Sequence, residues 1–307
     1  MAGVWLAQAF PVYPHGFPPE VIRAFESAIG RKTLGNKPAS GTEIIKELGE
    51  EHMRTGFPIV YTSGDSVFQI AAHEDVIPVP ELYRMCEIAR KILDGPNRVG
   101  RVIARPFTGA PGSFARTEGR RDFALTPPAR SYLQELEDAG VQVHAVGKID
   151  DLFAGVGVSV AHEGATNARA LAAVDELLAS LDGGLVLANL IETDQLYGHR
   201  KDAQGFAGAL REIDARVGRM LAALRAEDLL IVTADHGVDL SHPGTDHTRE
   251  YAPLLAVSGA MLARRAAGGG DLAGARHDGP LADVGASVLR WLTGRDGGGL
   301  PGQAFIS

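Results

Sequence analysis

The chain has 307 residues, of which 45% are hydrophobic and 22% charged, a composition that excludes a globally disordered protein. Its formal net charge of -8 opposes nonspecific binding to nucleic acid. The single cysteine, Cys86, cannot form an internal disulfide, and no apolar run is long enough to cross a membrane. The apolar start lacks basic residues and meets Pro11, unlike a signal peptide. We therefore expect a cytoplasmic protein without nucleic-acid or membrane partners.

The first third of the chain predicts helices and strands in alternation, after a start rich in aromatic residues and proline. Residues 35–43 contain many small polar side chains, which are typical of a surface turn and also of a backbone cradle for an anion. The stretch alone does not decide between these two interpretations. Apolar spacing predicts helices over residues 19–29 and 79–93, a helix ending at residue 48, and strands over residues 58–61 and 99–104.

A loop-like stretch at residues 109–128 combines glycine and proline with several arginines. Such a change of composition is typical of the connection between two domains. We therefore place a boundary inside it. The predicted domains are a smaller α/β domain over residues 1–118 and a larger one over residues 119–307.

Beyond this boundary, helices and strands alternate regularly along the sequence. That order indicates an α/β fold with a mainly parallel sheet and helices on both faces. The predicted helices cover residues 128–139, 166–181, 202–225 and 281–292, and the strands cover residues 141–146, 184–190, 229–233 and 253–257.

One of these strands, over residues 229–233, runs directly into Asp235, His236 and Gly237. In open α/β sheets, ligands bind beyond the carboxyl ends of the strands. Aspartate and histidine supply oxygen and nitrogen ligands suited to Zn²⁺ or Mn²⁺, and the glycine permits a sharp turn beside an ion. His247 follows a Pro-Gly turn that can fold it back over the same place. A lone Asp-His pair is more often structural, so the metal interpretation depends on a second cluster.

That second cluster follows the strand over residues 184–190, where Asp194 and His199 lie five residues apart. Because both clusters come at strand ends, their side chains can converge without long loops. Five donors are one short of what two ions usually require. The predicted metal ligands are Asp194, His199, Asp235, His236 and His247.

Polar residues also follow the two strands predicted in the first domain. Ser63 and Asp65 come after the strand over residues 58–61, where they suit sugar hydroxyls or phosphate oxygens, although a helix cap fits nearly as well. Arg101 and Arg105 lie at the strand over residues 99–104, where they can bind phosphate or extend from a sheet edge.

Four longer motifs together resemble the phosphopentomutase family of the alkaline phosphatase superfamily. They cover residues 35–43, 61–74, 100–107 and 243–251, and the resemblance extends over essentially the whole chain. It implies an alkaline-phosphatase-like core domain with a smaller α/β cap domain. It also implies an isomerase that interconverts ribose 1-phosphate and ribose 5-phosphate, and the 2-deoxy forms, with two Mn²⁺ ions, in nucleoside catabolism.

The resemblance also implies roles for individual residues. Asp194, His199 and His247 match the ligands of one ion, whereas Asp235 and His236 match ligands of the other. The residues that match positions lining the sugar-phosphate pocket are Ser63, Asp65, Arg101 and Lys148.

One part of the family pattern has no counterpart in this sequence. Met1 aligns with the point where the family's chain enters its cap domain. The first core strand, one aspartate of the second ion site and the phosphate-carrying threonine are therefore unmatched, and Thr62 belongs to a different motif. We assign no catalytic residue and expect an incomplete second ion site and little turnover. The alternatives are an inactive remnant that binds metal or phosphosugar, and a phosphatase or phosphoglycerate mutase of the same superfamily.

Overall fold

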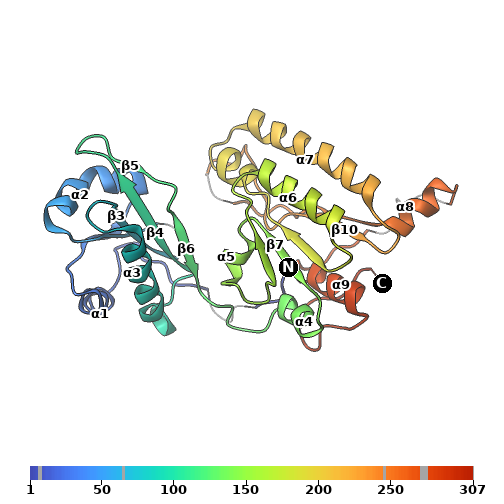
Figure 1. Ribbon diagram of the computed structural model, residues 1–307, viewed down its shortest axis with the longest axis horizontal. Helices are drawn as coiled ribbons and strands as arrows, with labels where there is room; N and C mark the ends of the chain where they lie inside the picture. Colours follow the sequence, from blue (N-terminus) through green and yellow to red (C-terminus); the bar gives the residue numbers. More distant parts are fainter. Residues whose placement is uncertain (6–8, 64–65, 245–246, 270–275, 307) are drawn as a thin grey trace. The chain divides into compact units, whose positions relative to one another are not determined.

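The structure is a computed structural model, and the chain divides into two compact units. One unit is Leu6–Thr126, and the other joins Met1–Trp5 to Pro127–Ser307. Each unit has its own β-structure (Figure 1) and its own hydrophobic core. The residues described are 1–5, 9–63, 66–244, 247–269 and 276–306.

The unit Leu6–Thr126 is built on a six-stranded mixed sheet of order β1-β2-β3-β4-β5, in which β6 also pairs with β4. The pairs β1–β2 and β3–β4 are parallel, and the other pairs are antiparallel. The strands are β1 (Leu34–Pro38), β2 (Ile59–Thr62), β3 (Val67–His73), β4 (Arg101–Thr108), β5 (Ala115–Arg116) and β6 (Arg121–Ala124). The helices are α1 (Pro19–Ile29), α2 (Gly41–Thr55) and α3 (Val79–Ile92), followed by the short 3₁₀ turn Gly95–Asn97.

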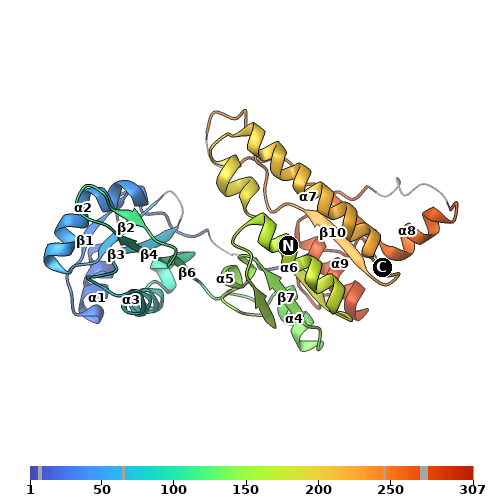
Figure 2. The same ribbon diagram turned by 45° about the horizontal axis from the view of Figure 1, so that its top comes forward.

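Helices cover both faces of this sheet. On one face, α1 and α3 pack Phe25 and Leu82 against Phe68 and neighbouring strand residues. On the other face, α2 packs Ile44 against Tyr61 and its neighbours, so each face has its own hydrophobic cluster. Figures 1 and 2 show α2 on the side of the sheet opposite to α1 and α3. Burial of these apolar faces is what stabilises the unit.

Four strands of this unit, β1, β3, β5 and β6, were not predicted from the sequence. β1 occupies part of the stretch 35–43 that was interpreted as a loop, because it pairs in parallel with β2 despite poor strand formers. Gly35 makes that pairing possible, since a Cβ at this residue would lie 2.6 Å from the carbonyl oxygen of Val60. The short strands β5 and β6 belong to the sheet through β4, and this unit ends at Thr126.

The second unit contains a three-stranded parallel sheet of order β8-β7-β9 and a separate antiparallel pair, β10–β11. The strands are β7 (Val143–Val146), β8 (Val160–His162), β9 (Leu185–Ala188), β10 (Leu229–Thr233) and β11 (Leu254–Ser258). The helices are α4 (Tyr132–Asp138), α5 (Ile149–Phe153), α6 (Asn167–Ser180), α7 (Ala203–Ala223), α8 (Gly259–Ala266) and α9 (Ala282–Thr293), with the π-helical turn η2 (Thr193–Gly198) after β9.

Two hydrophobic clusters lie on opposite faces of the β8-β7-β9 sheet. Val143 packs with residues of α4 and α9, whereas Val146 packs with residues of α6 and α7. Leu230 of β10 joins the second cluster, which anchors β10 beside α6 and α7. The predicted α/β class with helices on both faces is therefore confirmed, and the β10–β11 pair adds an antiparallel element that the alternation did not predict. Within the described residues, no helix has the length and apolar character needed to cross a membrane.

Candidate metal centre

The first donors come from the turn that follows β9. Residues 193–198 form a π-helical turn, and the N–H of His199 donates to the carbonyl oxygen of Asp194 at 3.1 Å. Gly198 is packed closely, because a Cβ there would lie 3.0 Å from the Thr193 carbonyl oxygen and 3.1 Å from Val238 Cγ1. This tight turn places the side chains of Asp194 and His199 side by side.

The remaining donors come from the segment between β10 and β11. After β10, the chain reaches Asp235 and His236, and Gly237 then pairs with Thr248 in an isolated antiparallel bridge. The Thr248 N–H donates to the Gly237 carbonyl oxygen at 3.0 Å, and the Asp239 N–H donates to Thr248 Oγ1 at 2.7 Å. Because His247 directly precedes Thr248, this bridge holds its imidazole next to His236.

Three of the predicted ligands meet at one point. Asp194 Oδ1 lies 3.3 Å from Nε2 of His199 and 3.3 Å from Nε2 of His247. Within the described part of the chain, these donor atoms form a group in which all lie within 4.8 Å of one another. Asp194 Oδ1 is buried and has no hydrogen-bond partner among the described residues. A buried oxygen without a partner, facing two imidazole nitrogens, suits a divalent cation such as Zn²⁺ or Mn²⁺.

Asp235 and His236 lie beside this group without belonging to it. His236 stacks on His247, with ring centroids 3.5 Å apart and ring planes at 15°. Its Nε2 is 3.7 Å from Asp235 Oδ1, and the Asp235 side chain is 61% exposed. The structure thus brings all five predicted ligands into one region but gathers only three donor atoms at a single cation-sized position.

The predicted sugar-phosphate residues lie in both units. Lys148 is in the same unit as the donor group, directly after β7 at the start of α5. Ser63 follows β2 in the other unit, where Arg101 begins β4 and its Nη1 donates to Asp122 Oδ2 at 3.3 Å. Asp65 lies outside the described residues. Their predicted convergence on one substrate therefore stays a prediction.

Sequence comparison assigns the class of protein. A profile described as Metalloenzyme superfamily matches residues 25–294, so the chain belongs to a superfamily of metalloenzymes. That match and the three-donor group agree in indicating a metal-dependent protein.

The comparison with curated relatives is more specific. The chain is 58% identical over 261 residues to a phosphopentomutase of Caldanaerobacter subterraneus subsp. tengcongensis, covering 85% of this chain and 66% of that protein. It is 57% identical over 258 residues to a phosphopentomutase of Dictyoglomus thermophilum, covering 84% and 66%, respectively. It is 48% identical over 292 residues to a phosphopentomutase of Desulfitobacterium hafniense, covering 95% and 73%. The chain belongs to the phosphopentomutase family and spans about two thirds of the length of the first two relatives.

A solved structure is also similar, but only distantly. The PH0037 protein from Pyrococcus horikoshii matches 82% of this chain and 76% of its own at 16% identity, with a TM-score of 0.37. That value is too low to support an inference about this fold.

Proposed function

We propose that this protein acts in the interconversion of ribose 1-phosphate and ribose 5-phosphate, and of their 2-deoxy forms, with two Mn²⁺ ions. The observation that carries the proposal is the buried Asp194 oxygen, which faces two imidazole nitrogens without a hydrogen-bond partner in the described structure. Membership of the phosphopentomutase family supports the choice of reaction.

In this proposal, Asp194, His199 and His247 hold one ion, and Asp235 and His236 contribute to a second site that these residues alone leave incomplete. Carboxylate oxygen and imidazole nitrogen are ligands that Mn²⁺ and Zn²⁺ both accept, so the donors fit the ions. When bound, the ions polarise phosphoryl oxygens and neutralise the charge that develops during transfer.

Four further residues would bind the sugar phosphate. Arg101 and Lys148 supply positive charge for the phosphate, and a guanidinium can hold two phosphate oxygens at once. Ser63 and Asp65 would bind sugar hydroxyls. Asp122 already accepts a hydrogen bond from Arg101 at 3.3 Å, which orients the guanidinium before substrate arrives. These roles rest on the family resemblance, as does the cap role of the first part of the chain.

Binding to the 307-residue chain tests the proposal, since no residue of it is assigned as the phosphate carrier. Calorimetric titration should show Mn²⁺ binding to the wild type and no tight binding to Asp194→Ala. With Mn²⁺ present, ribose 5-phosphate should bind more tightly than 3-phosphoglycerate. Tighter binding of 3-phosphoglycerate would favour another mutase of the superfamily.

The substrate role of Arg101 needs its own comparison. Arg101→Ala should weaken ribose 5-phosphate binding at least tenfold and leave Mn²⁺ affinity within about threefold, because a guanidinium–phosphate contact is charge-assisted. Arg23→Ala, at an exposed arginine of α1, is the matched control and should change neither. A larger loss of Mn²⁺ than of sugar-phosphate binding in Arg101→Ala would contradict the assignment.

A further inference from the structure

A reciprocal pair of hydrogen bonds joins the start of α6 to the turn that carries Asp194. The Asn167 N–H donates to Glu192 Oε2 at 3.1 Å, and the Glu192 N–H donates to Asn167 Oδ1 at 3.1 Å. Asn167 is only 2% exposed and Glu192 is half-buried, so both bonds are at least partly shielded from water. The two residues come from segments that are distant in sequence, and neither was singled out by the sequence motifs.

Glu192 directly precedes the π-helical turn Thr193–Gly198 and lies two residues before Asp194. Its backbone N–H and its carboxylate are both held by Asn167, so the chain is clamped at two points just before the metal ligand. The carboxylate also lies at the N-terminus of a 14-residue helix, where unpaired N–H groups and the helix dipole favour negative charge. The entry of the chain into the ligand turn is therefore set by the position of α6.

Glu192 does not belong to the donor group found in the described residues, which consists of Asp194, His199 and His247. Its carboxylate instead accepts the N–H of Asn167 at the start of α6. The arrangement also leaves Asn167 Nδ2 buried and without a hydrogen-bond partner in the described structure. An unpaired buried donor has lost its hydrogen bonds to water without replacement, which lowers the stability of the folded chain. Thr166 already caps α6 by accepting the N–H of Arg169. A buried Asn167 with an unpaired Nδ2 is therefore not needed to begin the helix.

We propose that Asn167 is a positioning residue for the metal centre, acting through Glu192 to hold Asp194 Oδ1 at its distance from the two imidazoles. This inference rests on the metal site of the proposed function. Outer residues that orient metal ligands typically change metal affinity 10- to 100-fold when they are removed. Asn167→Ala should therefore weaken Mn²⁺ binding about tenfold or more, because it frees the Glu192 N–H and loosens the turn.

The control is Thr166→Val, which removes the side-chain cap of the same helix and leaves the Asn167–Glu192 pair in place. Loss of such a cap lowers the stability of the helix. Mn²⁺ titration and thermal unfolding of both variants separate positioning from stability. Thr166→Val should melt at a lower temperature with Mn²⁺ affinity within about threefold of the wild type. Equal losses of Mn²⁺ affinity in the two variants would overturn the proposal, since helix stability would then explain both.

Two variants at Glu192 give a second test if Asn167→Ala fails to fold. Glu192→Gln keeps an acceptor oxygen for the Asn167 N–H and should bind Mn²⁺ nearly as the wild type does, whereas Glu192→Ala should lose about tenfold. If Glu192→Gln loses as much affinity as Glu192→Ala, Glu192 acts through its charge and the positioning role is wrong. If the wild type binds no Mn²⁺, the proposed metal site itself is wrong. If Asn167→Ala binds Mn²⁺ as the wild type does, only the positioning role of Asn167 is wrong.

Discussion

The imidazole of His236 lies flat against that of His247, with ring centroids 3.5 Å apart. His247 Nε2 in turn lies 3.3 Å from Asp194 Oδ1. A residue proposed for the second ion is therefore in direct contact with a ligand proposed for the first. His236 can therefore act in two ways: its ring packs against His247, and its nitrogen can bind the second ion. Substitutions at His236 can separate the two roles.

His236→Phe keeps an aromatic ring against His247 and removes the nitrogen ligand. We expect it to bind Mn²⁺ at the first site with nearly wild-type affinity and to lose whatever Mn²⁺ binding the incomplete second site retains. His236→Ala removes the ring as well, so His247 loses a packing partner and the first site should weaken about threefold to tenfold. Calorimetric stoichiometry and affinity distinguish the two. Loss of both ions in His236→Phe would show that His236 is itself a ligand of the first site.

Gly237→Ala should damage the metal centre although Gly237 offers no ligand. A Cβ there would lie 2.7 Å from Glu250 Oε2 and 3.0 Å from both the Glu250 nitrogen and the Thr248 carbonyl oxygen. The backbone of residues 248–250 must move to relieve this contact, and His247 moves with it. We expect at least tenfold weaker Mn²⁺ binding.

The control for that substitution is Gly218→Ala in α7, where a Cβ would meet nothing within 4 Å. Alanine is favoured over glycine inside a helix by about 1 kcal/mol, so this variant should be more stable with unchanged Mn²⁺ binding. Normal affinity in Gly237→Ala would show that the bridge to Thr248 does not hold His247.

Acid should destabilise the unit Leu6–Thr126 through His52. This imidazole is buried, its Nδ1 lies 2.7 Å from the Phe57 carbonyl oxygen, and its Nε2 accepts the His73 N–H at 2.8 Å. Burial lowers the pKa of His52 below its ordinary value of 6.5. As the pH falls through about 6.5, His52 therefore binds a proton in the unfolded chain but stays neutral in the folded chain. The stabilising effect is complete above that pH and is lost as the pH falls below it.

His52→Gln should flatten this dependence, because glutamine has no proton to gain. We expect the variant to be about 1–3 kcal/mol less stable than the wild type near neutral pH, since the two hydrogen bonds of the ring are disturbed. The difference should shrink as the pH falls through about 6. Urea denaturation at several pH values measures it, with the exposed His15→Gln as control. A constant difference at all pH values would refute the role of His52.

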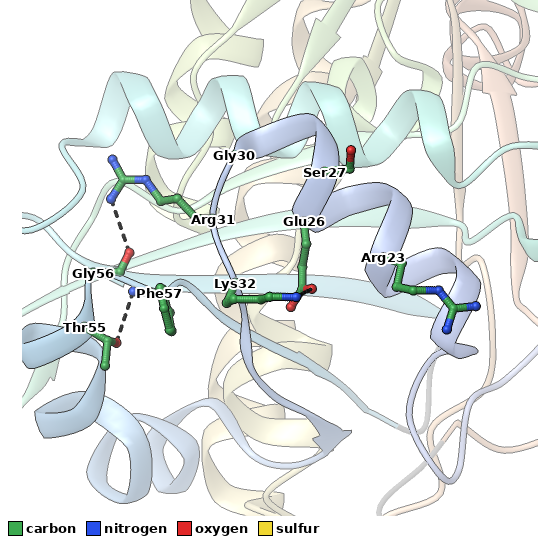
Figure 3. A pocket seen from close by; sticks show the side chains of 9 residues that line it. All are labelled: Arg23, Glu26, Ser27, Gly30, Arg31, Lys32, Thr55, Gly56 and Phe57. Carbon is green, nitrogen blue, oxygen red and sulfur yellow. Dashed lines mark hydrogen bonds and ion pairs between the residues drawn. The ribbon is translucent and has the colours of Figure 1, made fainter.

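Arg31 links the three helices of the same unit, as Figure 3 shows for its contact with Gly56. Its Nη1 donates to the Gly56 carbonyl oxygen at the end of α2 at 3.2 Å, and its Nη2 contacts Glu81 Oε1 of α3 at 2.7 Å. Arg31 itself follows α1. The side chains are about one third exposed, so solvent reduces the ionic part of the contact.

Arg31→Met keeps much of the apolar stem and removes both contacts. We expect a loss of about 1 kcal/mol in the free energy of unfolding, because a positive charge at a helix C-terminus and one ion pair are removed. Arg54→Met is the control, since its contact with Glu51 is 3.8 Å long and its side chain is 73% exposed. Similar losses in the two variants would mean that Arg31 contributes no more than an ordinary surface charge.

Local sequence patterns predicted the parts of the candidate site that depend on strand ends. An apolar run followed directly by Asp235 and His236 indicates both a strand and its polar edge, and β10 ends at Thr233 as expected. The same reasoning placed Asp194 and His199 after β9. The structure adds the reason that His247 comes close, which is the Gly237–Thr248 bridge.

Other features depend on contacts between distant segments and leave no local pattern. β1 contains Gly35 and Pro38, so its sequence resembles a loop, and only pairing with β2 makes it a strand. The Asn167–Glu192 pair joins a helix start to a turn 25 residues away. Thr166 caps α6 by accepting the Arg169 N–H, but no spacing rule connects that cap with a metal ligand.

All three atoms of the donor group belong to the unit that contains Pro127–Ser307, while the other unit has its own hydrophobic core. A ligand that binds only the folded state raises stability by mass action, by about 2.7 kcal/mol at a hundredfold excess over its dissociation constant. Added metal should therefore raise the melting temperature of one unit and leave the other nearly unchanged. A single calorimetric transition would then separate into two as the metal concentration rises, and the transition that does not move would belong to Leu6–Thr126.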